Sequence, residues 1–128
     1  MELFVEDMDA SVGFYRDVLG FRVERRGADY ASIRRGSVVL GLGPVAKLPE
    51  RADGPGFSRE RLGRDKGAGV EIVLELDSLD EVRALYDHCR ERTAISAPLE
   101  SQPWGLHDFR LADPDGYYLR ITHGNAAA

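Results

Sequence analysis

Two short stretches decide the fold, Gln102-Pro103-Trp104-Gly105 and Asp113-Pro114-Asp115-Gly116. The second predicts a tight turn, because proline presets φ and glycine tolerates positive φ. On either side of it, residues 108–112 alternate polar with apolar side chains and residues 117–122 are rich in β-forming types. Two strands joined by a turn are therefore expected. The one tryptophan, Trp104, lies in a loop at a strand entrance, where an indole is well placed to stack on a flat ligand.

A weak internal repeat divides the chain into two halves. Residues 3–9 and 74–80 are both strand-like runs that end in an acidic turn and lead into a helical pattern. Each half then predicts three short strands, at 21–25, 30–34 and 37–42 in the first, and at about 94–97, 108–111 and 117–122 in the second. The order strand-helix-strand-strand-strand thus appears twice, which predicts an α+β fold of two βαβββ modules.

Each predicted helix has an N-cap candidate and one apolar face. Asp9 or Ser11 can cap the first helix, which is expected to end at Gly20, and Asp77 or Ser78 can cap the second. The apolar positions are Val12, Tyr15, Val18 and Leu19 in the first helix, and Leu79, Val82, Leu85, Tyr86 and Cys89 in the second.

The middle of the chain is too long for an ordinary connection. We place module one at about 1–43, a loop or linker at about 44–67 and module two at about 68–123, all within a single domain, 1–128. The middle segment is either a flexible linker or a lid over a binding cleft, with a short helix around 58–62. Residues 125–128 are expected to be a frayed tail.

Composition excludes some classes of partner. A formal net charge of −5 argues against nucleic acid or an anionic membrane as partner and mildly favours a neutral or cationic ligand, although ordinary solubility is the more common reason for such a charge. The single cysteine, Cys89, excludes an intramolecular disulfide and a cysteine zinc cluster. No apolar run resembles a signal peptide or a membrane span, so a cytoplasmic location is expected.

Together the motifs resemble the vicinal oxygen chelate superfamily, which includes glyoxalase I, extradiol dioxygenases, fosfomycin resistance enzymes and bleomycin resistance proteins. The resemblance rests on two pairs of motifs: residues 103–105 with residues 113–116 in the second half, and residues 5–15 with residues 18–21 in the first half. It covers nearly the whole chain except about 44–66. It implies that the two modules form a curved mixed β-sheet cup with the helices on its outer face.

The enzymes of this superfamily hold a divalent metal in the cup through four strand positions. Here the first position would fall just ahead of Met1, the second on Leu40 or Gly41, the third on Glu71 and the fourth on Arg120. Glu71 is thus the only surviving candidate ligand, and a guanidinium beside it opposes metal binding. We expect no metal or other cofactor and an ion pair between Arg120 and Glu71; the alternative is that both face solvent. A start upstream of Met1 that restores the first ligand stays open.

No catalytic residue is predicted. The three histidines, His88, His107 and His123, lack the spacing of a metal pair, so each is expected at the surface. No nucleophile motif and no phosphate-binding glycine loop is present in the sequence.

The candidate ligand-binding residues are Trp104, Tyr30, Asp29 and Phe57. Bleomycin resistance proteins are similar in having an aromatic residue at the Tyr30 position and Pro-Trp-Gly in the same register. The alternatives are that Trp104 is a structural plug that caps the sheet and that Tyr30 is an ordinary strand aromatic.

The resemblance implies non-catalytic binding of a planar or cationic small molecule, with a cationic aromatic antibiotic as one candidate. A homodimer is expected, since relatives of this type pair their modules across subunits, and exchange of the N-terminal strand stays open. The alternative is a metal-dependent lyase, isomerase or dioxygenase with atypical ligands, and a third reading is a scaffold domain without a small ligand.

Overall fold

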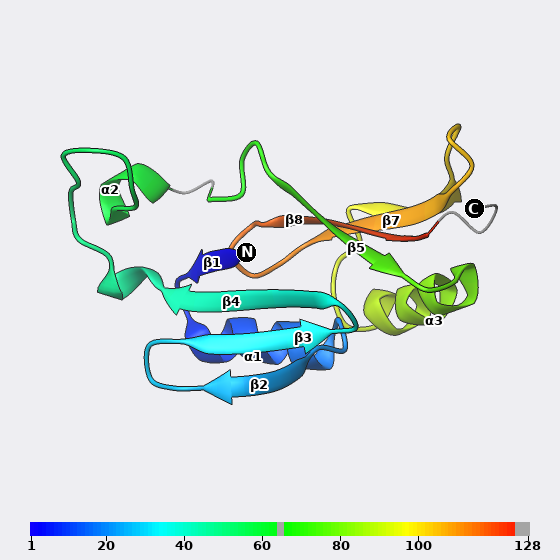
Figure 1. Ribbon diagram of the computed structural model, residues 1–128. Helices are drawn as coiled ribbons and strands as arrows, with labels where there is room; N and C mark the ends of the chain where they lie inside the picture. The colour runs from blue at the N-terminus through cyan, green and yellow to red at the C-terminus, as the bar shows by residue number, and fades with distance from the viewer. Residues whose placement is uncertain (64–65, 125–128) are drawn as a thin grey trace.

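The computed structural model describes residues 1–63 and 66–124, so the expected tail at 125–128 and two residues of the predicted linker lie outside the described residues. Figure 1 shows two sheets, each accompanied by a helix. The elements in chain order are β1 (Glu2–Val5), α1 (Met8–Asp17), β2 (Arg22–Arg26), β3 (Ala31–Arg35), β4 (Val38–Pro44), the 3-10 helix η1 (Val45–Lys47), α2 (Arg59–Leu62), β5 (Glu71–Leu76), α3 (Leu79–Arg90), β6 (Ala97–Ser101), β7 (His107–Ala112) and β8 (Tyr118–His123).

Both sheets have the same topology. The strand orders are β1-β4-β3-β2 and β5-β8-β7-β6. In each sheet the first strand pairs in parallel with the last, and the other pairs are antiparallel. The predicted repeat of βαβββ modules is therefore confirmed, and the fold is α+β with two curved, open sheets.

Helix α1 begins at an acidic cap that the sequence prediction missed. The Asp7 carboxylate accepts the Ala10 N–H at 3.0 Å, so the predicted caps Asp9 and Ser11 are wrong. Asp7 is the residue with extended backbone at the start of the helix, whereas Asp9 and Ser11 lie inside it. At the other end, α1 stops at Asp17 with Val18 as its C-cap, earlier than the predicted end at Gly20; Gly20 itself has φ 75 in the turn that follows the helix.

Helix α3 has the predicted Ser78 cap. The Ser78 hydroxyl accepts the Glu81 N–H at 3.1 Å, and the Glu81 carboxylate accepts the Asp77 N–H at 2.9 Å. This reciprocal capping satisfies two backbone donors at the helix start. The predicted apolar face is confirmed, with Val82, Leu85 and Cys89 buried and Leu79 and Tyr86 partly buried.

The sixth strand begins three residues later than predicted. The sequence prediction placed it at about 94–97, whereas β6 is Ala97–Ser101 and includes Pro98. Proline is tolerated here because β6 is an edge strand and its pairing with β7 is irregular between Ala97 and Glu100.

One hydrophobic core joins the two modules. Along β5, Ile72, Leu74 and Leu76 are buried, while Glu71, Val73 and Glu75 are exposed on the other face. Buried residues of both helices and both sheets form one cluster. We call the face of each sheet opposite its helix the cup face.

The predicted turn at 113–116 is present and forms a joint between the modules. The buried Tyr15 hydroxyl of α1 donates to Asp113 Oδ2 at 2.7 Å. Asp113 Oδ1 accepts the N–H groups of Asp115 and Tyr117, both at 2.9 Å. Gly116 closes the turn with φ 87. Because Tyr15 belongs to the first module, this turn has a second role in holding the two modules together.

The same turn contacts β1. Asp115 accepts the Glu6 N–H at 2.9 Å, and the Lys66 ammonium lies 2.9 Å from Glu6 and 3.5 Å from Asp115. The Tyr117 hydroxyl donates to the Phe4 carbonyl at 2.8 Å. The joint therefore uses side chains and backbone from both modules.

The segment between the modules contains the short helix that the sequence predicted. Ser58 caps α2, and the Arg61 guanidinium donates to the carbonyl groups of Ala52, Gly54 and Gly56. In Figure 1 this segment projects beyond the end of β4. Its role as a lid stays a prediction. Across residues 1–63 and 66–124, the helices are too short or too polar to cross a membrane.

Candidate functional site

The second module has a hollow of about 530 Å3 on its cup face. Alternation along β5 places residues 71, 73 and 75 on this face. Strands β7 and β8 and the β6–β7 hairpin complete the walls. The size is within the range of small-molecule sites. The lining residues are Glu71, Val73, Glu75, Trp104, Leu106, Arg110, Arg120 and Thr122.

The predicted ion pair lies in this hollow. Arg120 Nε donates to Glu71 Oε1 at 2.8 Å, and Arg110 Nη1 lies 4.0 Å from Glu71 Oε2. Arg110 and Arg120 are directly opposite each other on β7 and β8, where like charges are destabilising. Glu71 offsets this repulsion because its carboxylate lies near both guanidinium groups. The interpretation in which Glu71 and Arg120 both point away into solvent is wrong.

The residues around Glu71 do not fit a divalent metal. A cation would have to displace Arg120 and remain close to two permanent positive charges. Within the described ranges, 1–63 and 66–124, no group of three histidine, cysteine or acidic side chains gathers at one point. At the second family position, Gly41 has no side chain and Leu40 is buried in the core.

Trp104 lies at the tip of the β6–β7 hairpin. The Gly105 N–H donates to the Gln102 carbonyl at 3.0 Å, which closes a turn with Pro103 and Trp104 at its centre. Gly105 has φ 92. The indole is 57% exposed and borders the hollow. A plug that caps the sheet would be buried, so the exposure of the indole argues against that interpretation.

Residues that sequence reasoning missed support this hairpin. His123 Nε2 accepts the His107 N–H at 3.0 Å, and the Thr122 hydroxyl donates to the His107 carbonyl at 2.9 Å. The prediction that His123 lies at the surface is wrong, since its ring is buried. The predicted strand ended at Thr122, one residue short. Acceptance at Nε2 leaves Nδ1 as the protonated nitrogen, which donates to the Gly124 carbonyl at 2.9 Å.

Two further side chains proved structural. Gln102 donates to the buried Asp108 carboxylate at 2.9 Å, which ties the start of the hairpin turn to β7. Cys89 is buried as predicted, and burial raises the pKa of its thiol to about 11. A thiol with so high a pKa is a poor nucleophile at neutral pH.

The other three candidate residues lie in or beside the first module. Tyr30 is 42% exposed, and its ring covers Gly41. Asp29 lies 3.6 Å from the Lys47 ammonium. Phe57 is exposed, with its ring centroid 4.5 Å from that of Phe4. These three residues therefore do not line the hollow beside Trp104 of the same chain.

Solved structures of other proteins have the same fold. A lactoylglutathione lyase from Agrobacterium tumefaciens is 21% identical, with a TM-score of 0.73 over 97% of this chain and 90% of that chain. A glyoxalase/bleomycin resistance protein/dioxygenase from Nocardioides is 23% identical, with a TM-score of 0.75 over 100% and 83%. TioX from Micromonospora sp. ML1 is 21% identical, with a TM-score of 0.72 over 96% and 94%. At these identities the likeness shows the fold alone.

A search of curated proteins found no match. The family model described as Glyoxalase/Bleomycin resistance protein/Dioxygenase superfamily matches residues 1–121. This match covers both modules and the segment between them. The resemblance seen in the motifs is thereby confirmed: the chain belongs to the glyoxalase/bleomycin resistance protein/dioxygenase superfamily.

Proposed function

We propose that this chain binds a flat small molecule in the hollow of the second module, without catalysing a reaction on it. One observation carries the proposal. The exposed Trp104 indole borders a hollow in which the family's metal position is taken by the Glu71–Arg120 ion pair. The indole offers a stacking surface, whereas the ion pair offers no open coordination site.

The chemistry of the walls suits a planar ligand with polar substituents. Val73 and Leu106 supply apolar contact beside the indole. The Glu75 carboxylate lies on the same wall and would attract a cationic substituent. A cationic aromatic antibiotic is one ligand of this class, in keeping with the bleomycin resistance proteins of the superfamily.

We further propose that the protein acts as a homodimer. Val39 and Val73 are exposed apolar residues on the cup faces of the two sheets, and Tyr30, Phe57 and Trp104 are also exposed. A second copy that places its first module over the hollow would cover this surface. Tyr30, Asp29 and Phe57 of one subunit would then face Trp104 of the other, which unites the four predicted residues in one cleft.

Binding and stability measured on the same Trp104 variants test the proposal. A fluorescence screen with cationic glycopeptides and planar aromatic compounds should find a saturable change in Trp104 emission. Loss of one stacking contact, worth about 1–3 kcal/mol by analogy with bases, should weaken binding roughly ten- to hundredfold in Trp104→Ala. Calorimetric titration supplies the affinity of this variant, which has no indole.

Trp104→Phe, which keeps an aromatic surface, is the matched control and should retain most of the affinity. The melting temperature should change little in either variant, because the indole is exposed. A large drop in melting temperature with unchanged affinity per folded molecule would contradict the proposal. Turnover of a superfamily substrate that depends on added metal would favour the alternative, a metal-dependent lyase, isomerase or dioxygenase.

A further inference from the structure

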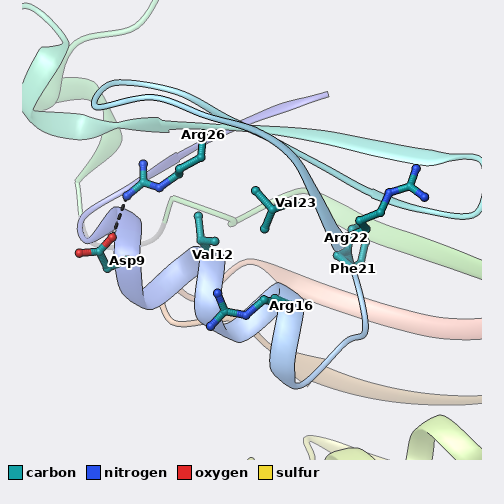
Figure 2. A pocket seen from close by; sticks show the side chains of 7 residues that line it. All are labelled: Asp9, Val12, Arg16, Phe21, Arg22, Val23 and Arg26. Atoms are coloured by element: carbon teal, nitrogen blue, oxygen red, sulfur yellow. Dashed lines mark hydrogen bonds and ion pairs between the residues drawn. The ribbon is translucent and has the colours of Figure 1, made fainter.

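A second cavity lies on the opposite side of the first sheet from its cup face. It is a groove of about 740 Å3 between α1 and the edge strand β2, and Figure 2 shows the side chains that line it. This volume is within the range of small-molecule sites. Because the groove lies away from the cup faces, an inference about it does not depend on the function proposed above.

The floor of the groove is apolar. Val12 and Phe21 are buried and Val23 is partly buried. Asp9, Val12 and Arg16 follow one another at spacings of three and four residues, so they share one face of α1. The helix therefore presents an apolar centre flanked by one acidic and one basic side chain.

A β-bulge brings a further arginine to the groove. Val23 pairs with Ile33, but the next pair is Arg25 with Ser32, so Glu24 is an extra residue in β2. Arg26 consequently pairs with the buried Ala31 and lies on the α1 side of the sheet. Without the bulge, Arg25 would pair with Ala31 and lie on the α1 side in place of Arg26.

Arg26 is held in position over the groove. Its Nη2 donates to Asp9 Oδ1 at 2.7 Å, and its Nη1 donates to the Gly27 carbonyl at 2.8 Å. The Asp9 side chain is 93% exposed, so water screens this ion pair and an incoming anion can replace the Asp9 carboxylate. The bond to Gly27 would keep the guanidinium oriented during this exchange.

The three arginines of the groove differ in how firmly a carboxylate holds each of them. Arg16, Arg22 and Arg26 line the groove together with the carboxylate of Asp9. Arg16 donates to Asp17 at 2.8 and 2.9 Å, and Arg22 donates to Glu24 at 3.0 Å. These pairs neutralise Arg16 and Arg22, and Arg22, which pairs with Arg34 across the sheet, points away from α1 (Figure 2). Arg26, whose partner Asp9 is largely exposed, is therefore the guanidinium that an incoming anion can reach.

We propose that the groove binds a small amphipathic carboxylate. The Arg26 guanidinium matches the two oxygens of a carboxylate, and Val12, Phe21 and Val23 would contact the apolar body of the ligand. A second copy of the chain fits less well, because Arg22, Arg25 and Arg26 on the edge strand would face like charges.

A titration with octanoate, followed by NMR of the valine methyl groups, tests this proposal on the whole chain. Saturable shifts should appear at Val12 and Val23. Arg26→Gln should weaken binding roughly tenfold or more, since a charge-assisted hydrogen bond is lost, and Arg26→Lys should recover part of the affinity. Arg25→Gln is the matched control, because it changes the same charge on the other face of the strand.

Four results would overturn the proposal. Three of them are the absence of a saturable shift at Val12 and Val23 with octanoate, binding of octanamide as tight as that of octanoate, and a loss of affinity in Arg25→Gln as large as that in Arg26→Gln. A change of oligomeric state in Arg26→Gln, seen by sedimentation, would identify a second copy as the occupant and also contradict it.

Discussion

The Tyr15→Phe variant should lose about 2 kcal/mol of the free energy of unfolding. The Tyr15 side chain is 0% exposed, and its hydroxyl donates to the buried Asp113 carboxylate at 2.7 Å. A hydrogen bond to a charged group contributes about 1.5–3 kcal/mol, and water has no access to replace the lost donor. Phenylalanine keeps the ring, so the packing against Phe14 and Phe21 remains.

The cost should also depend on pH. Burial raises the pKa of Asp113 above its ordinary value, while the hydrogen bond from Tyr15 acts in the opposite direction. A carboxyl group whose pKa is raised by folding stabilises the fold at low pH, and this contribution is lost as pH rises through the folded pKa. Removal of the donor should raise the pKa of Asp113 further. The difference between the two proteins should therefore be largest at neutral pH and shrink as Asp113 becomes protonated.

Urea unfolding followed by circular dichroism, at neutral pH and near pH 4, measures both effects. Tyr86→Phe is the matched control, since Tyr86 is half buried and its hydroxyl has no hydrogen-bond partner among the described residues. A loss in Tyr15→Phe below about 0.5 kcal/mol would refute the reasoning, because ordinary surface substitutions change stability by as much. An equal loss at both pH values would refute the part assigned to Asp113.

Two further predictions concern metal and assembly. After incubation with divalent manganese, iron, nickel and zinc, elemental analysis should find far less than one tightly held ion per chain. The reason is that the guanidinium groups of Arg110 and Arg120 flank Glu71. One ion per chain in this protein, lost in Glu71→Ala, would contradict this prediction. Sedimentation at micromolar concentration should show a dimer, because the cup faces expose Val39 and Val73. A single species of 14.2 kDa would show that the exposed cup faces do not pair.

Local patterns were enough to predict the order of the elements. Alternation in β7, the β-forming residues of β8, the glycine turns and the apolar helix faces each depend on residues close together in the sequence. The Glu71–Arg120 pair could also be predicted, because the family motif places both positions in the same cup. The position of Trp104 at a hairpin tip follows from the turn residues around it.

Features that depend on register could not be predicted in this way. Arg26 lies in the groove between α1 and β2 because a bulge moves it to the helix side of the sheet, and periodicity does not reveal where a bulge falls. The burial of His123 depends on one additional strand residue and on a backbone donor sixteen positions away. The joint at Asp113 depends on Tyr15, which is distant in sequence.

The packing of Tyr30 on Gly41 has a consequence for how such a protein can evolve. A Cβ atom at position 41 would lie 3.0 Å from the Tyr30 hydroxyl oxygen and 3.2 Å from its ring. Position 41 is also one of the two places where the family would supply its second metal ligand. A histidine or glutamate introduced there would have to push the tyrosine ring aside. Tyr30 in its present position and a ligand side chain at position 41 therefore compete for the same space, so a lineage that gains a metal ligand there must reposition this aromatic wall.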